Sequence, residues 1–387
     1  MALHPSQGSA SLEHRLAEIL GSAPRRSPNV RVLAGYAQHI HCHLATLGFA
    51  AGVNFDRLLA KTRFQVPFGQ SPFAIGRGLG FEKRLRADDY AALRRLLRAL
   101  PGFPADGARV VNLRQGYPRN STALPLRADD TLKLLEQIVR GEPDAPHLID
   151  GAVLTATIAG RPAYFEADAL AAWAQAHIHA AEVKSFPKVD ERVDPDKLAA
   201  ALDQVAFYIL LTRDAVGRLG GDPERLVSDQ ALLITPKNVG MQPTLSEQRV
   251  SRRVERNRKL LDSIPEPGEV IAAVPAGLSF GPVADISADQ RVRLEVLQDI
   301  AGRVGTCYES SCLATCGNAK FCRERAFRAG TPNVTGTGAI RLLPGIPTLD
   351  RAEELTRGAA PAPEETAAAT LLERAGRLYD ETTGKAG

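Results

Sequence analysis

Residues 177–186 read HIHAAEVKSF, and this stretch decides the fold that we expect. Its pattern is typical of a β-strand, in which alternate side chains share a face. Glu182 and Lys184 would then point the same way, while Val183 points into the opposite layer. Asp194-Pro195-Asp196 follows and opens a long helix to about residue 215, with the proline near the first helical position. A strand followed by a helix in this way indicates an α/β fold.

The surrounding sequence extends this interpretation. Residues 147–158 form a strand-like run, the turn Ala159-Gly160-Arg161-Pro162 follows it, and residues 163–165 return from the turn. Residues 168–176 are expected to form a short helix, and residues 231–235 another apolar strand. We therefore predict a mixed central sheet flanked by helices.

Composition narrows the class of protein only a little. The chain has 387 residues, 48 Lys plus Arg against 44 Asp plus Glu, and a net charge of +4. This mild basicity is compatible with a nucleic-acid partner but decides nothing alone. We find no apolar run long enough to span a membrane, and the first twenty residues carry charges where a signal peptide would be apolar. A cytoplasmic location without a membrane partner is the expectation.

Acidic and basic side chains converge around the 177–186 strand. Asp150 ends the preceding strand, His147-Leu148-Ile149-Asp150-Gly151. With Glu182 and the backbone carbonyl of Val183 it would make an all-oxygen site for Mg²⁺ or Mn²⁺. Such an ion lowers the pKa of its bound water, and Lys184 would help to position that nucleophile. The alternative is that Glu182 and Lys184 form an ordinary surface ion pair.

Two further features support a catalytic site. Gln204 and Tyr208 lie four residues apart on one face of the helix after the strand. The glycine-rich stretch Gly76-Arg77-Gly78-Leu79-Gly80-Phe81-Glu82 enters a helix expected over residues 81–97, and Glu82 would add a third acid. The alternatives are a core-filling tyrosine and a helix with an acidic first turn.

Four of the five cysteines fall within one short segment, as Cys307, Cys312, Cys316 and Cys322. In a reducing compartment such a cluster holds a metal more often than disulfides. Four thiolates suit a [4Fe–4S] cluster or Zn²⁺. Zinc knuckles usually use cysteines two residues apart, which this segment lacks, and the wider spacing together with the motif residues upstream favours the iron–sulfur cluster over zinc or free thiols.

Histidines form a second, weaker metal hypothesis. His39 and His43 flank Cys42 and would share a zinc ion if one helix carried both, but partly exposed polar residues are the simpler interpretation. His177 and His179 point away from Glu182 on the expected strand, so we assign them no catalytic role.

A basic helix is expected over residues 245–261. Its residues Arg249, Arg252, Arg253 and Arg256 would track the phosphates of a nucleic acid. The alternative is a solvated face on which these arginines alternate with glutamates.

In order and spacing, Asp150, the Glu182-x-Lys184 pair and the Gln204-x-x-x-Tyr208 element resemble the RecB-like branch of the PD-(D/E)xK nuclease superfamily. Gly76 to Glu82 looks like the first motif of that family, without the histidine that it often carries. The cysteine segment resembles iron–sulfur nucleases of the AddB type and the CRISPR-adaptation nucleases. In those relatives the fourth cluster ligand comes from near the N-terminus, so Cys42 competes with Cys307, and the sequence leans slightly to Cys307.

The resemblance implies a restriction-endonuclease-like fold and a metal-dependent deoxyribonuclease, endo or exo. DNA repair, recombination and antiviral defence against mobile DNA are the implied processes. The chain would comprise a variable leader (1–28), a mainly helical part carrying Glu82 (29–125), a nuclease core (126–262), a helical segment with the cysteines (263–330) and an Ala/Pro/Thr-rich appendage (331–387). DNA is the expected partner, and any helicase or ATPase would be a separate protein.

Two rival functions remain at this point. One is a non-catalytic nucleic-acid-binding or scaffold module, in which the cysteines form a structural staple. The other is a zinc-stabilised regulatory protein.

Overall fold

The computed structural model describes residues 7–37, 39, 41–65, 72–118, 121–173, 177–186, 193–238 and 240–383. The chain divides into two compact units. Unit 1 comprises residues 1–26, 34–68 and 266–387, and unit 2 comprises residues 27–33 and 69–265. The two ends of the chain thus belong to the same unit, while the linear division into five segments stays a prediction. Residues 1–6 of the expected leader and 384–387 of the expected appendage lie outside the described residues.

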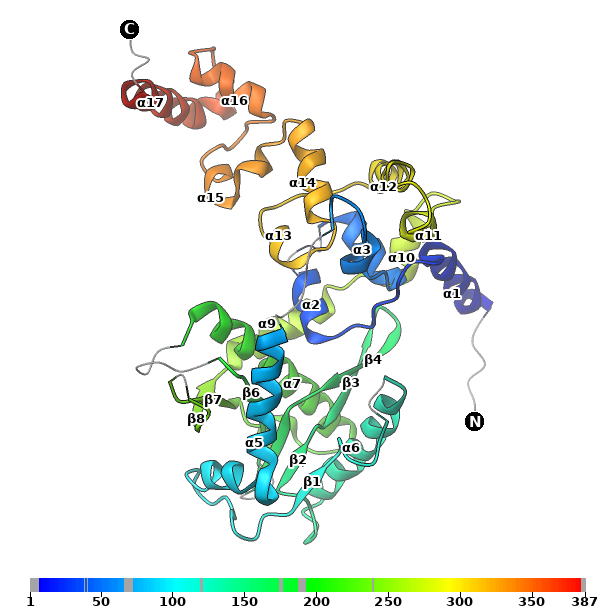
Figure 1. Ribbon diagram of the computed structural model, residues 1–387, viewed down its shortest axis with the longest axis vertical. Coiled ribbons are helices and arrows are strands. Elements are labelled where there is room, and N and C mark those ends of the chain that lie inside the picture. Colours follow the sequence, from blue (N-terminus) through cyan, green and yellow to red (C-terminus); the bar gives the residue numbers. More distant parts are fainter. Residues whose placement is uncertain are drawn as a thin grey trace. The chain divides into compact units, whose positions relative to one another are not determined.

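A six-stranded mixed sheet forms the centre of unit 2, in the order β1-β2-β5-β6-β7-β8 (Figure 1). Its strands are β1 (Val110–Asn112), β2 (Leu148–Asp150), β5 (Ala169–Trp173), β6 (His177–Val183), β7 (Gln230–Pro236) and β8 (Pro243–Arg249). The pairs β1–β2 and β6–β7 are parallel, and the other neighbours are antiparallel. The mixed α/β class and the helix-flanked mixed sheet are therefore confirmed.

Helices cover the sheet of unit 2. Helix α5 (Pro72–Leu97) packs on the face that carries Ala169 and Ala181, with Phe81 fully buried between them. Helix α7 (Pro195–Arg218) packs on β6 and β7. The remaining elements of the unit are η1 (Ser121–Ala123), α6 (Leu124–Val139), β3 (Val153–Ile158), β4 (Arg161–Glu166), α8 (Pro223–Leu226) and α9 (Ser251–Asp262).

The start of α7 shows how local sequence sets its boundary. The side chain of Asp194 accepts hydrogen bonds from the backbone N–H groups of Asp196 and Lys197, which otherwise lack partners at a helix start. Pro195 occupies the first turn, where no N–H is needed. The predicted helix start is thus confirmed, and the helix runs three residues beyond the predicted end.

Two predictions around the sheet need correction, one of a strand and one of a helix. The run 147–158 is broken at Gly151, which has φ +73°, into β2 and β3, and β3 pairs with β4 in a separate two-stranded sheet. The turn predicted over 159–162 is confirmed, with Ala159 and Gly160 both at positive φ. The short helix predicted over 168–176 is wrong, because residues 169–173 form the buried strand β5 and burial outweighs the helix propensity of its alanines.

Three expected helices also differ from the structure. Residues 245–249 of the predicted basic helix belong to strand β8, and only α9 is helical. A helical pattern over residues 32–47 also predicts one helix, but the described residues form two, α2 (Val30–Ala37) and α3 (His43–Ala51). The helix predicted over 81–97 is interrupted inside α5, where Asp88, Asp89 and Tyr90 adopt left-handed φ angles.

Unit 1 is helical in the residues that the structure describes. It contains α1 (Gln7–Leu20), α3, α4 (Phe55–Leu58), α10 (Pro267–Ala272), α11 (Gly281–Ala284), α12 (Gln290–Val304), α13 (Cys312–Thr315), α14 (Ala319–Arg328), η2 (Pro332–Thr335), α15 (Thr337–Ile340), α16 (Leu349–Thr356), η3 (Pro363–Glu365) and α17 (Thr366–Thr383). No helix in the described part of the chain is both long and apolar enough to cross a membrane.

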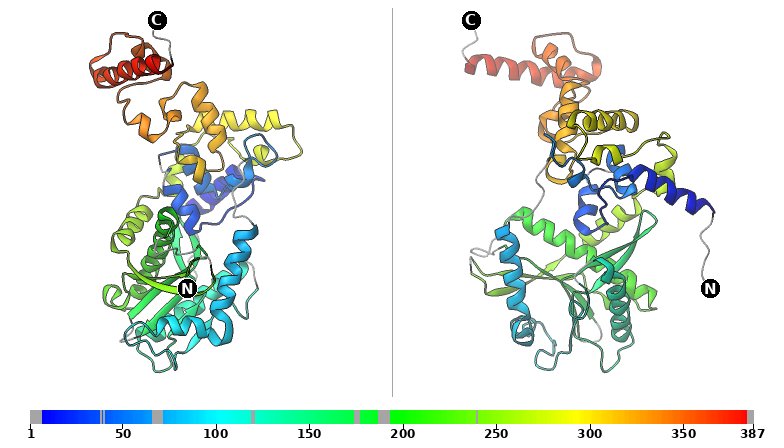
Figure 2. Two further views of the ribbon diagram at one scale, coloured as in Figure 1. Left: turned by 60° about the vertical axis from the view of Figure 1, so that its left-hand side comes forward. Right: turned by 45° about the vertical axis from the view of Figure 1, so that its right-hand side comes forward.

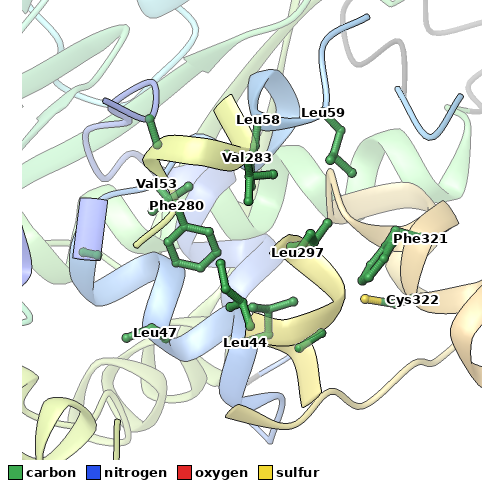
Figure 3. Close-up of a cluster of buried hydrophobic side chains, with 14 of the residues drawn as sticks. Leu44, Leu47, Val53, Leu58, Leu59, Phe280, Val283, Leu297, Phe321 and Cys322 are labelled. Atoms are coloured by element: carbon green, nitrogen blue, oxygen red, sulfur yellow. The ribbon is translucent and has the colours of Figure 1, made fainter. Parts of the chain in front are cut away.

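One apolar core joins the N-terminal and C-terminal segments of unit 1. Leu44 and Leu47 of α3 lie in it together with Phe280, Leu297 and Phe321 from the C-terminal half (Figure 3). All five are at most 5% exposed. Because burial of such side chains contributes about 1.5–3 kcal/mol each, this core holds segments together that are more than 200 residues apart in sequence.

The buried arginine Arg293 of α12 supports the same core. Its side chain is 2% exposed, and it donates hydrogen bonds to the carbonyl oxygens of Val283, Ala60 and Leu58 at 2.8, 3.1 and 3.2 Å. Two of these carbonyls end helix α4, where carbonyl groups lack partners within the helix. The Arg293 guanidinium thus donates the hydrogen bonds that water would otherwise provide to these three backbone carbonyl groups.

We expect Arg293→Ala to lower the free energy of unfolding of unit 1 by about 3 kcal/mol or more, because three carbonyl groups lose their donor. Urea unfolding followed by circular dichroism measures the change. Arg291→Ala, on the exposed side of the same helix, is the matched control and should leave the transition in place. Equal midpoints for the two variants would contradict the assignment.

Candidate functional site

The register of β5 and β6 places two acidic residues opposite each other. Ala169 pairs with Ala181, so Asp168, one residue earlier, lies opposite Glu182. The backbone N–H of Val183 donates a hydrogen bond of 2.8 Å to Oδ2 of Asp168. Asp168 is therefore anchored to the strand that carries Glu182.

Lys184 connects Glu182 to helix α7. Its Nζ lies 2.5 Å from Oε1 of Glu182 and donates to Oε1 of Gln204 at 2.9 Å. Gln204 Nε2 in turn donates to the hydroxyl of Tyr208 at 2.8 Å. Because Gln204 and Tyr208 are one helical turn apart, both reach the strand end. The structure thus brings together four of the residues singled out in the sequence.

Glu182 is completely buried. The pKa of its carboxyl group is raised from 4.5 to about 8, mainly by burial; the nearby Asp168 carboxylate contributes to the rise and the Lys184 ammonium opposes it. Burial is also the main reason that the pKa of Asp168 is raised. Apart from the Lys184 ammonium, neither carboxylate oxygen of Glu182 has a hydrogen-bond partner among the described residues. A buried carboxylate in this state is costly unless a cation compensates it.

The prediction that Asp150 lies on the strand next to Glu182 is wrong. Strand β5 lies between β2 and β6. Asp150 pairs with Ala169 of β5, and Ala169 pairs with Ala181 of β6. Ala181 and Glu182 are consecutive, so their side chains point to opposite faces of the sheet, and Asp150 shares the face of Ala181. The Asp150 carboxylate instead binds Arg86, Arg114 and the Tyr90 hydroxyl.

Asp168 is the residue that sequence reasoning missed. It was assigned to a helix because alanines follow it, and so it was not considered as a partner of Glu182. The available signal was the run Glu166-Ala167-Asp168, whose two acids lie sixteen and fourteen residues before Glu182.

Glu82 approaches the site from α5. Its Oε2 lies 2.9 Å from Nη1 of Arg86, and its side chain is one-third exposed. The charge of Glu82 contributes to the raised pKa of both Asp168 and Glu182. The third acid predicted from the glycine-rich segment is therefore within electrostatic range of the other two.

The donor set suits a hard divalent cation. The carboxylates of Asp168 and Glu182 lie near the end of β6 with the charge of Glu82 in electrostatic range, and the buried Glu182 has oxygen lone pairs to offer beyond its contact with Lys184. Within the described ranges, no three His, Cys, Asp or Glu side chains form a group that could hold a metal ion in their present positions. The carbonyl of Val183 stays a predicted ligand.

All five cysteines lie together in unit 1. Cys42, Cys307, Cys312, Cys316 and Cys322 line one small pocket with His39. Burial raises the pKa of Cys312 to about 11 and that of Cys316 to about 12, and that of Cys322 well above its usual value. Uncharged thiols are thus favoured unless a metal binds, since coordination removes the proton.

Cys42 is central among these thiols and Cys307 is peripheral. The charge on Cys42 affects the pKa of each of the other four cysteines, whereas Cys307 affects that of Cys312 alone among the C-terminal three. Cys42 is also buried, while Cys307 is partly exposed. Both thiols line the pocket, so the slight preference of the sequence for Cys307 stays a prediction, and Cys42 is the more buried of the two candidates.

The shared zinc site of His39 and His43 is not formed. The two residues do not share a helix, because α3 begins at His43. His39 contacts Thr315 Oγ1 at 2.6 Å and Cys312 Sγ at 3.6 Å, and His43 contacts the Val304 carbonyl at 3.2 Å. His179 stacks on Trp173 with ring centroids 4.4 Å apart, which agrees with the prediction that it points away from Glu182.

Three of the four arginines predicted to contact nucleic acid pair with carboxylates of the protein itself. Arg253 and Arg256 both bind Asp203 of α7. Arg249, on β8, lies 3.3 Å from Asp229. Arg252 is exposed at the start of α9. The alternative interpretation was a solvated face with interleaved glutamates, whereas the observed partners are aspartates of other segments; a nucleic-acid role stays a prediction.

No protein-family model and no curated protein matches the sequence. The residues themselves therefore carry the functional argument.

The raised pKa of Glu182 predicts how the metal-free protein responds to pH. Between about pH 4.5 and 8 the folded state holds a proton on Glu182 that the unfolded chain releases. Stability therefore falls as pH rises through this window, by up to about 1.4 kcal/mol per pH unit, and Asp168 acts in the same direction. Urea unfolding in EDTA at several pH values measures the slope.

Glu182→Gln cannot ionise, so we expect it to flatten this slope. Glu142→Gln, an exposed carboxylate in the same unit, is the matched control and should keep it. An unchanged slope in Glu182→Gln would show that Glu182 is not the group that takes up the proton.

Proposed function

We propose that the chain is a divalent-metal-dependent nuclease that hydrolyses phosphodiester bonds of DNA on a restriction-endonuclease-like core. The observation that carries the proposal is the buried Glu182 carboxylate, flanked by Asp168 and Lys184 and otherwise without a partner. The order and spacing of Glu182, Lys184, Gln204 and Tyr208 are those of the RecB-like nucleases that the sequence resembles. Cleavage in repair, recombination or defence against mobile DNA is the role that we propose.

In this proposal Asp168 replaces Asp150 as the acid that acts with Glu182. Asp168, Glu182 and Glu82 would hold Mg²⁺ or Mn²⁺, which when bound polarises a phosphodiester and acidifies water. Lys184, whose side chain is 29% exposed, is able to orient a water from the solvent side. Gln204 fixes that ammonium, and Tyr208 fixes Gln204, so the α7 residues set the direction of the lysine.

We expect Asp168→Asn, Glu182→Gln and Lys184→Ala each to reduce metal-dependent DNA cleavage by about a hundredfold or more, since each removes a charge from the reacting centre. The measurement is the cleavage of labelled single- and double-stranded DNA with Mg²⁺ or Mn²⁺ against EDTA. Lys133→Ala, an exposed lysine of the same unit, is the control and should retain activity.

A folded Glu182→Gln protein that cleaves DNA at the wild-type rate would contradict the site. A wild-type protein that binds DNA without cleaving it in any metal would instead favour the non-catalytic binding module.

We further propose that unit 1 binds a [4Fe–4S] cluster through Cys42, Cys312, Cys316 and Cys322. The support is the common pocket of these thiols and the central place of Cys42 among them. The cluster would have a structural role, because its ligands come from α13, α14 and the residue before α3, and thus join the two chain ends.

Cys42→Ser should lose iron and visible absorbance after anaerobic purification, whereas Cys307→Ser should retain both, because Cys307 is peripheral. Iron, sulfide and zinc analysis of the two variants measures this. Loss of iron in Cys307→Ser with retention in Cys42→Ser would reverse the assignment, and stoichiometric zinc without iron would replace the cluster by a zinc site.

A further inference from the structure

The buried Asp150 carboxylate has three partners in unit 2. Nε of Arg86 lies 2.7 Å from Oδ2 and Nη2 lies 3.3 Å from Oδ1. Arg114 binds Oδ1, and the Tyr90 hydroxyl donates to Oδ2 at 2.7 Å. Asp150 is 3% exposed, so both oxygens are occupied within the protein. Such a carboxylate has little capacity left to bind a metal.

Each of the two arginines extends from Asp150 to an acid of the candidate site. Arg86 Nη1 reaches Oε2 of Glu82 at 2.9 Å. Arg114 Nη2 lies 3.5 Å from Oδ1 of Asp168, and its Nη1 donates to the Asp168 carbonyl at 3.3 Å. Arg114 Nε also donates to Glu166 at 2.7 Å. One buried carboxylate is thus linked to two site acids through two guanidinium groups.

The backbone is adapted to these contacts at two places. Asp88, Asp89 and Tyr90 adopt φ angles of 51°, 52° and 63°, a left-handed turn that costs energy for residues with a Cβ. The turn interrupts α5 directly after Arg86 and directs the Tyr90 hydroxyl to Asp150. At Gly151 a Cβ would come within 2.6 Å of Arg114 Cγ, so the glycine lets this arginine approach.

We propose that Asp150 is a positioning residue, which orients Glu82 through Arg86 and Asp168 through Arg114 for the divalent cation. This inference rests on the proposed function. In the native site the Asp150 carboxylate partly neutralises the positive charges of Arg86 and Arg114. Without its negative charge the guanidinium groups would bind Glu82 and Asp168 more tightly and compete with the cation for the same oxygens. Residues of this kind around metal ligands change metal affinity about 10–100-fold.

Asp150→Asn tests the proposal because it keeps the shape and removes the charge. Calorimetry with Mn²⁺ in the absence of DNA should show affinity about 10–100-fold weaker than in the wild type, with unchanged stoichiometry. Cleavage should require correspondingly more Mn²⁺ and return to near the wild-type rate at saturation. Asp130→Asn, an acid on the surface of the same unit, is the matched control and should leave the affinity unchanged.

Arg86→Lys and Arg114→Lys separate the two arms and remain informative if Asp150→Asn does not fold. Each keeps the charge but loses the geometry that lets one guanidinium hold two carboxylates, so each should weaken Mn²⁺ binding. Unchanged Mn²⁺ affinity in all folded variants would overturn the proposal. So would an Asp150→Asn rate that stays low at saturating Mn²⁺, because Asp150 would then be a ligand itself. A wild type that neither binds Mn²⁺ nor cleaves DNA would instead reject the proposed function.

Discussion

The chemistry of unit 2 depends on one unfavourable arrangement, a fully buried glutamate beside a second carboxylate. Glu182 is fully buried and, apart from the Lys184 ammonium, has no hydrogen-bond partner among the described residues. Asp168, held opposite by the β5–β6 register, adds negative charge to the same place. The Lys184 ammonium beside Glu182 and the Arg114 guanidinium, 3.5 Å from Asp168, still leave the pKa of both carboxyl groups raised. The fold therefore maintains a local deficit of positive charge, which a divalent ion is suited to fill.

The sheet and α7 fix this arrangement in different ways. Pairing of β6 with β5 and β7 sets the direction of Glu182, because a one-residue slip would turn it to the α5 face. Helix α7 acts on Lys184 alone, through the chain from Gln204 to Tyr208. The pKa of Tyr208 is raised by burial, so its hydroxyl keeps its proton and can support Gln204 over the range in which the glutamate titrates. Backbone pairing thus positions the acids Glu182 and Asp168, while the side-chain hydrogen bonds of Gln204 and Tyr208 position the Lys184 ammonium.

The sequence was informative where the signal is local and failed where distant segments decide. Strand periodicity placed Glu182 and Lys184 on one face, and Asp194 with Pro195 marked the start of α7, because both signals act over a few residues. Asp150 and Asp168 each adjoin a sheet strand, and nothing in their neighbourhoods tells which lies opposite Glu182. That choice depends on the β3–β4 hairpin leaving the main sheet, which lets β5 insert between β2 and β6. The alanines of β5 favour a helix in isolation, and only burial in the sheet makes them a strand.

The cysteines of unit 1 also show that local sequence does not predict which distant segments come together. Spacing in the sequence alone does not tell whether Cys42 or Cys307 is the fourth ligand. The apolar core already holds the two segments together, so a ligand 270 residues away in sequence loses little more conformational entropy on binding than a near one. Leu44 and Leu47 pack beside the C-terminal helices and bring the adjacent Cys42 into the thiol pocket. The core therefore prepares the site, and a bound cluster would add cross-links between segments already in contact. The acids around Glu182 belong to unit 2 and the thiols to unit 1, so each group of side chains depends on the packing of its own unit; Figure 2 gives two further views of the helices and strands of these units.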